Sequence, residues 1–93
     1  MSNYARGRAK EYAAIEILRA LGFNARRSAG SHSPVDVTAD RAGETIYIQV
    51  KYNCGIAPGE LKAFKAYATA PGIKKQVWLF KRGVKLPKVV DCE

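Results

Sequence analysis

Four residues of this sequence have types and spacing that suit a metal-assisted hydrolytic site. Gln49 follows Asp36 after a short stretch of chain, and Lys51 stands two positions after Gln49. A carboxylate and an amide oxygen suit a hard cation such as Mg²⁺ or Mn²⁺, and Glu11 could add a second carboxylate. A lysine beside such a cation could orient an attacking water or help to deprotonate it. The surrounding elements must therefore bring these four residues together.

The segment around Gln49 has the pattern of a half-buried strand. Residues 44–52 (ETIYIQVKY) alternate apolar and polar side chains with the period of two that such a strand requires. Ile46, Ile48 and Val50 form its apolar face. The other face then ends with an amide and an ammonium group side by side.

Asp36 is predicted to lie in a second strand, over residues 35–39, with its side chain on the polar face. Residues 40–44, with Gly43, make a tight connection, so the two strands should pair as antiparallel neighbours and place Asp36 close to Gln49. Aspartate is depleted in strands, which indicates that this carboxylate serves a purpose. The apolar face of this strand should carry Val35, Val37 and Ala39.

Residues 4–21 are predicted to form a helix that ends at Gly22, with apolar residues at steps of three and four. At 100° per residue, Glu11 falls at the edge of the apolar stripe, whereas Glu16 lies nearly opposite it, in solvent. The stripe comprises Ala14, Ile17, Leu18 and Leu21.

Three further strands and a second helix complete the expected fold. Residues 23–29 form the first strand of the meander, and residues 60–70 form the helix, which ends before Pro71-Gly72. Residues 76–81 are apolar on both faces, so that strand needs cover from the second helix and from either the first helix or a partner subunit. Residues 84–90 form a last strand that Pro87 confines to an edge. The inner side of the second helix should carry Leu61, Phe64 and Ala68.

The composition indicates one small soluble domain, residues 1–93, with a polyanionic partner. Sixteen Lys and Arg against eight Asp and Glu give a net charge of +8 and a pI near 9.8, which favours nucleic acid over an acidic membrane surface. No apolar run approaches a membrane span, and the N-terminal residues lack the pattern of a secretory signal, so a cytoplasmic location is expected, in the host if a virus encodes the chain. Cys54 and Cys92 should be free thiols. A domain of this size buries only about 60 to 65 % of its unfolded surface, so a dimer is plausible.

Three sequence segments resemble the PD-(D/E)XK nuclease superfamily and, within it, the archaeal-type Holliday junction resolvases. They are GRAKEYAAIEILRALGF, RSAGSHSPVDV and IYIQVK. The resemblance implies an α/β fold with a restriction-endonuclease-like core, in which two helices flank a central mixed five-stranded sheet. It also implies a homodimeric, Mg²⁺-dependent endonuclease, for which Mn²⁺ could substitute, that resolves four-way DNA junctions by paired symmetric nicks. The expected partners are branched DNA and a second copy, with no membrane and no small-molecule substrate.

The resemblance also implies roles for individual residues. Glu11, Asp36 and Gln49 would bind the metal together with the backbone carbonyl of Val50, and Lys51 would serve the water. Arg27 and Ser31 match positions beside the scissile phosphate, and Ser31 joins the catalytic set. The predicted DNA contacts are Arg6, Arg8, Lys10, Arg26, Arg27 and His32.

Two residues depart from the family pattern. Tyr12 stands where the family often has arginine, so a backbone contact from that position is not expected. Gln49 replaces the usual glutamate, and because an amide brings no charge, we expect weaker metal binding, with Mn²⁺ favoured.

Simpler interpretations exist for several of these residues. Glu11 could be an exposed helix acid or the partner of Arg8, and Gln49 with Lys51 could be a solvated strand face. His32 could be a surface turn residue. Two aromatic residues, Trp78 and Phe80, are expected in the core or a dimer interface rather than stacked on bases.

Two other functions fit the same residues. A related nicking endonuclease for other branched or duplex DNA would use the same core, and a non-catalytic DNA-binding module could carry Gln49 as the mark of a decayed metal site. The fold by itself does not separate these functions from junction resolution.

Overall fold

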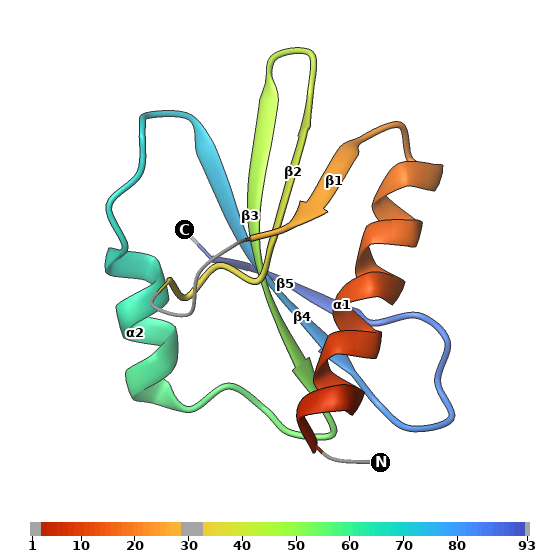
Figure 1. The fold of residues 1–93 in the computed structure, drawn as a ribbon. Coiled ribbons are helices and arrows are strands. Elements are labelled where there is room, and N and C mark those ends of the chain that lie inside the picture. Colours follow the sequence, from red (N-terminus) through yellow and green to blue (C-terminus); the bar gives the residue numbers. More distant parts are fainter. Residues whose placement is uncertain (1–2, 29–32, 93) are drawn as a thin grey trace.

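A computed structural model describes residues 3–28 and 33–92, with the side chains of the first helix described from Arg8 onward. One mixed sheet has the strand order β1-β2-β3-β4-β5, with β3 and β4 parallel and the other pairs antiparallel (Figure 1). The expected α/β class, a mixed five-stranded sheet with two helices, is confirmed. The elements are α1 (Asn3–Ala20), β1 (Asn24–Arg27), β2 (Val37–Arg41), β3 (Glu44–Tyr52), α2 (Pro58–Ala66), β4 (Ile73–Phe80) and β5 (Lys88–Cys92).

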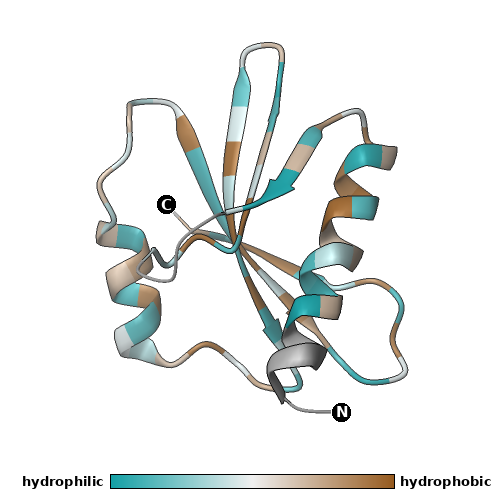
Figure 2. Ribbon diagram, viewed as in Figure 1, coloured by the Kyte–Doolittle hydropathy of each residue, from teal (hydrophilic) through white to brown (hydrophobic). Residues whose placement is uncertain are grey.

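The larger core lies between α1 and one face of the sheet. Ala14 and Leu18, one helical turn apart, are fully or almost fully buried against Ile48 of β3. Trp78 and Phe80 of β4 belong to the same cluster, so these aromatic residues are core residues, as predicted. Figure 2 shows hydrophobic segments recurring along α1 and the central strands.

The smaller core lies on the opposite face, under α2. Phe64 is the buried residue of this short helix, and it packs with Val77 and Cys92. Val77 and Trp78 are consecutive residues of β4 in different clusters, which confirms that β4 is covered on both faces. The first helix, rather than a partner subunit, supplies the second cover.

The helix ends differ in detail from the predictions. α1 ends at Ala20, followed by Gly22 at φ +92° with the N–H of Phe23 bonded to the carbonyl of Leu18. Leu21 was predicted to lie on the buried stripe, but it falls beyond the helix end and is 59% exposed. α2 begins two residues earlier than predicted, at Pro58, and ends at Ala66, where Tyr67 leaves the helical conformation.

Two strands begin later than predicted. The chain bends at Pro34 and at Asp36, so β2 begins at Val37 and Asp36 precedes it. Val35 therefore packs in the core under α2 instead of sharing a face with Val37. β5 begins after Pro87 and is an edge strand, as predicted.

Neither helix in the part of the chain that the structure describes is long and apolar enough to cross a membrane.

Candidate active site

Asp36 is fixed directly beside Gln49. Its backbone N–H donates to the carbonyl of Ile48 at 2.9 Å, and its Oδ2 accepts from the N–H of Val50 at 2.8 Å. These two contacts lie on either side of Gln49 in β3. The sequence prediction that the carboxylate and the amide are neighbours is therefore correct, although Asp36 reaches this place from a bend rather than from a strand.

The side chain of Gln49 has a buried oxygen that lacks a partner. Oε1 accepts no hydrogen bond, and it is the one buried side-chain nitrogen or oxygen of the described residues in this condition. Leaving such an acceptor unsatisfied costs about 1 to 3 kcal/mol. An unpaired buried oxygen beside a carboxylate fits a site that binds a cation.

Glu11 lies on α1, near enough for its charge to raise the pKa of Asp36. Its side chain is 20% exposed, and its Oε1 accepts from Arg27 Nε at 2.9 Å, across to the end of β1. The guanidinium of Arg27 also lies 5.4 Å from the ring centre of Tyr12. Glu11 is thus a half-buried acid held by a cation and not a fully solvated helix residue.

Asp36 is a half-buried carboxylate whose surroundings change its pKa. Burial raises the pKa of Asp36 above its ordinary value, and the nearby charge of Glu11 raises it further. The N–H of Val50 and the charges of Lys51 and Arg27 act in the opposite direction. A pocket in which burial and a like charge both oppose ionisation of a carboxylate favours a bound cation.

Lys51 has a partner that the sequence did not reveal. Its Nζ donates to Oε2 of Glu60 at 2.6 Å, and this contact lowers the pKa of Glu60. Glu60 lies in the first turn of α2. An acid in the first turn of a helix is a common feature, and only the path of the connection after β3 brings it to Lys51.

The residues predicted to contact DNA lie in different environments. Arg26 is paired with Asp40 at 2.8 Å, and Arg27 is the partner of Glu11. The Nζ of Lys10 lies 5.1 Å from the ring centre of Tyr52 and 5.8 Å from that of Phe80, a cation–π position. Arg8 is exposed. The side chain of Arg6, and Ser31 and His32, lie outside the described residues.

The donor set fits a divalent cation but is poor in charge. It offers the carboxylates of Glu11 and Asp36, the amide of Gln49 and the Val50 peptide. The described residues contain no cluster of three or more His, Cys, Asp or Glu side chains suited to a metal, and the proposed set has two acids and an amide. Magnesium accepts oxygen ligands of all these kinds.

Comparison with known proteins finds a matching family model and a similar solved structure. A family model described as archaeal Holliday junction resolvase (Hjc) matches residues 2–69. Hjc of Archaeoglobus fulgidus, described as a Holliday junction resolvase from an archaeal hyperthermophile, has a similar solved structure. The TM-score is 0.76 at 22% sequence identity, over 94% of this chain and 73% of that chain, which shows a shared fold. A search of curated proteins finds no match.

Proposed function

Since the chain belongs to the archaeal Holliday junction resolvase family and is an endodeoxyribonuclease acting on branched DNA, we propose that it resolves four-way junctions as a Mg²⁺-dependent homodimer that makes paired symmetric nicks. The observation that supports the metal site best is the buried, unpaired Oε1 of Gln49 beside Asp36. Mn²⁺ could substitute for Mg²⁺. We propose that the enzyme acts in the cytoplasm, or in the cytoplasm of the host if a virus encodes the chain.

Each residue of the cluster has a proposed task. Glu11, Asp36, Gln49 and the carbonyl of Val50 would hold the cation, which when bound supplies charge stabilisation at the scissile phosphate and activates water. Lys51 orients the attacking water, and Glu60 positions Lys51 through their 2.6 Å contact. Arg27 holds Glu11 and contacts the phosphate. Ser31 remains a predicted catalytic residue beside the scissile phosphate, and His32 remains a predicted DNA contact.

Paired nicks require two such clusters at a fixed separation. The described chain carries one set of the proposed ligands, so one copy cuts one strand and a second copy, related by two-fold symmetry, cuts the opposing strand. Phosphate contacts supply affinity without reading sequence, so binding should depend on DNA shape and fall with salt.

A panel of DNA substrates tests this function. A four-way junction, a flap, a nicked duplex and a plain duplex of matched sequence are incubated with Mg²⁺, with Mn²⁺ or with EDTA. Paired cuts in the junction alone, with a metal, are the expected result. Cuts in the other substrates would indicate a different nicking nuclease, and metal-independent binding without products would indicate a non-catalytic module.

A change at Gln49 tests the metal site specifically. Gln49→Glu adds a negative charge to the ligand set, so cleavage at low Mg²⁺ should be kept or raised, and Mg²⁺ should raise the melting temperature more than in the parent protein. Cleavage against metal concentration and thermal unfolding with and without Mg²⁺ give the two readouts. If the substitution abolishes cleavage while fold and DNA binding persist, Gln49 has a role other than coordination.

A further inference from the structure

The connection between β4 and β5 is strongly basic and its charges are unpaired. Residues 81–88, KRGVKLPK, which we name the cationic turn, comprise this connection and Lys88, the first residue of β5, and contain four basic residues and no acidic one. All four side chains are exposed, and none forms an ion pair with a carboxylate that the structure describes. These residues are Lys81, Arg82, Lys85 and Lys88.

Several basic residues elsewhere are engaged within the fold. Arg26, Arg27 and Arg41 each have a carboxylate partner, and Lys51 and Lys74 are paired as well. The predicted DNA contacts at Arg26 and Arg27 are therefore partly neutralised. The charge of the cationic turn is available for an external anion.

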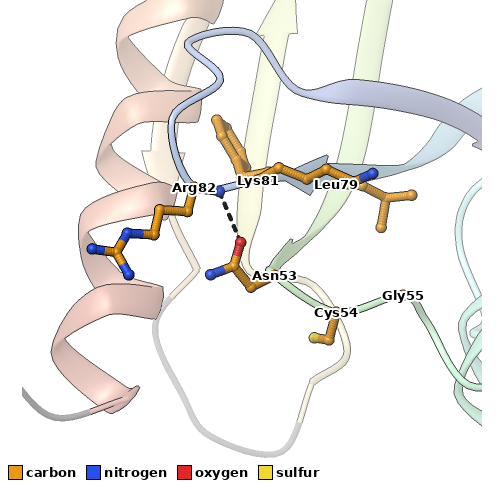
Figure 3. A pocket seen from close by; sticks show the side chains of 7 residues that line it. Asn53, Cys54, Gly55, Leu79, Lys81 and Arg82 are labelled. Atoms are coloured by element: carbon orange, nitrogen blue, oxygen red, sulfur yellow. Dashed lines mark hydrogen bonds between the residues drawn. The ribbon is translucent and has the colours of Figure 1, made fainter.

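Asn53 fastens the cationic turn to the strand that carries Lys51. Its N–H donates to the carbonyl of Phe80 at 2.8 Å, and its Oδ1 accepts from the N–H of Arg82 at 2.8 Å (Figure 3). Asn53 has a positive φ of 56°, a conformation that asparagine tolerates. Because Asn53 follows Lys51 by two positions, the turn has a defined position relative to the end of β3.

A cavity lies beside the hydrogen bonds of Asn53. It has a volume of about 400 Å³ and opens between the end of β3 and the start of the turn, lined by Asn53, Cys54, Gly55, Leu79, Lys81 and Arg82 among others. Lys10 approaches from α1, since its ammonium group lies over the ring of Phe80. A basic residue of α1 therefore lies beside the residue that directly precedes the turn.

The cationic turn also exposes apolar side chains. Leu86 is 68% exposed and Val84 51% exposed, and Figure 2 shows hydrophilic and hydrophobic residues interleaved along this segment. Proteins that bind distorted DNA combine backbone cations with apolar side chains that contact unstacked bases. A solvated loop has no need of this combination.

We propose that the cationic turn binds the phosphate backbone of a junction arm next to the cleavage site, with Leu86 against the bases at the branch point. This inference rests on the proposed function, because it assigns the arm-binding surface of the same enzyme. Charge decides between DNA and a second copy as the occupant. A two-fold pairing of this turn would place four cations against four, whereas DNA offers the complementary charge.

Salt-dependent binding measures the number of contacts directly. Binding of a four-way junction is measured in EDTA from about 50 to about 200 mM salt for the parent and for Lys81→Gln/Arg82→Gln. Each lost phosphate contact should reduce the slope of log K against log salt by about one, so the loss of affinity over this range should be about tenfold smaller in the variant. Lys62→Gln/Lys65→Gln, on the exposed side of α2, removes the same charge as a control and should leave the slope unchanged.

The outcomes separate this inference from the proposed function. Equal slopes in the turn variant and in the α2 control would overturn the inference even if the parent resolves junctions. A parent that binds but never cuts junctions would refute the proposed function, while the slopes still decide the role of the turn. Leu86→Ser should weaken junction binding without changing the sedimentation coefficient. If it instead dissociates a dimer and leaves junction binding intact, the turn is a subunit interface and the inference is wrong.

Discussion

At the scale of single residues, Asp36 shows a conflict between stability and chemistry. Burial and the charge of Glu11 raise its pKa, so the folded protein binds more protons than the unfolded chain between the ordinary and the raised value. The free energy of unfolding contributed by this residue therefore falls as pH rises through that window. A carboxylate that costs stability at neutral pH is consistent with a residue kept for its ligand role.

Replacing the carboxylate of Asp36 should separate its effect on stability from its role in cleavage. Asp36→Asn keeps an oxygen that can accept from the N–H of Val50 but removes the charge, so metal-free stability at pH 7 should stay equal or rise while junction cleavage is lost. Urea unfolding in EDTA and a cleavage assay measure the two. The stability difference should shrink at acid pH, where Asp36 is protonated. A large loss of stability at pH 7 would mean that the charged form is stabilising.

Asn53 permits a test of backbone conformation against hydrogen bonding. Asn53→Gly keeps the positive φ accessible and removes the acceptor for the N–H of Arg82, which should cost about 1 kcal/mol. Asn53→Ala loses the same bond and also places a Cβ in the left-handed region, which should cost about 1 kcal/mol more. Denaturant unfolding of both variants gives the comparison. Equal losses would mean that the left-handed conformation relaxes in the alanine variant.

At the scale of elements, periodicity predicted most of the fold. Alternation in residues 44–52 gave β3 with its bounds, and the two-faced apolar pattern of β4 correctly implied two covering layers. The faces of Val35 and Leu21 were wrong because a bend before β2 and the end of α1 interrupt the period at those residues. At these two residues the apolar pattern continues in the sequence although the regular element does not.

One part of the candidate site was predictable from the sequence, because it depends on contacts between strands that are close in the chain. Asp36 directly precedes β2 and Gln49 lies in β3, and a short turn joins these two strands, so the proximity of the two residues followed from local pairing. The contact of Lys51 with Glu60, and that of Glu11 with Arg27, depend on how helices pack across the sheet. Such contacts depend on three-dimensional packing, which a spacing pattern in one chain does not encode.

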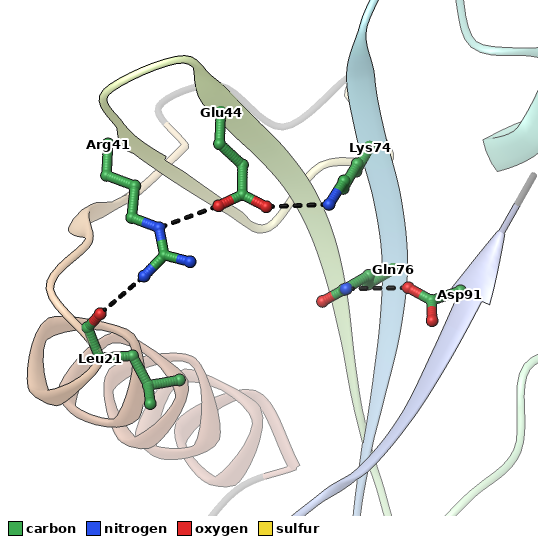
Figure 4. Close-up of polar contacts among 6 residues, drawn as sticks. All are labelled: Leu21, Arg41, Glu44, Lys74, Gln76 and Asp91. Carbon is green, nitrogen blue, oxygen red and sulfur yellow. Dashed lines mark hydrogen bonds and ion pairs between the residues drawn. The ribbon is translucent and has the colours of Figure 1, made fainter.

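One ion-pair network joins three elements at the end of the sheet opposite the end of β3. Glu44, at the start of β3, accepts from Arg41 of β2 and Lys74 of β4, both at 2.9 Å. Arg41 also donates to the carbonyl of Leu21 beyond α1, as Figure 4 shows. The same figure shows Gln76 donating to Asp91, which links β4 to β5. Lys74 and then Arg41 lower the pKa of Glu44.

The sign of this shift predicts a pH dependence. Because the folded pKa is below the ordinary value, the stabilisation by Glu44 is complete above the ordinary glutamate range and disappears as pH falls through the lowered value. Glu44→Gln should therefore be less stable than the parent at pH 7, and this difference should shrink as the pH falls through the lowered pKa of Glu44, as measured by urea unfolding. The effect should be small because the pairs are exposed. Glu16→Gln, an exposed change on α1, should show no such convergence, and an identical profile for both variants would contradict the assignment.

At the scale of the whole molecule, the proposed dimer has a direct test. Mixing the parent with Asp36→Asn subunits should give mixed dimers with one intact cluster, which nick one strand. On a supercoiled plasmid with an extruded cruciform, paired nicks within one binding event give linear product, and single nicks give open circles. Open circles should therefore increase in proportion to the mixed dimers. An unchanged ratio of linear to open-circular product would show that one subunit makes both cuts.

The parallel pairing of β3 with β4 has a consequence for how such enzymes diverge. All proposed metal ligands and Lys51 precede the end of β3, whereas the cationic turn follows β4, so the proposed chemistry and the proposed arm contact of this turn are encoded in separate parts of the gene. Substitutions that change DNA binding by the cationic turn can accumulate without changing the residues proposed for cleavage. Descendants of one ancestor can therefore differ in how this turn contacts DNA while the residues proposed for cleavage stay the same.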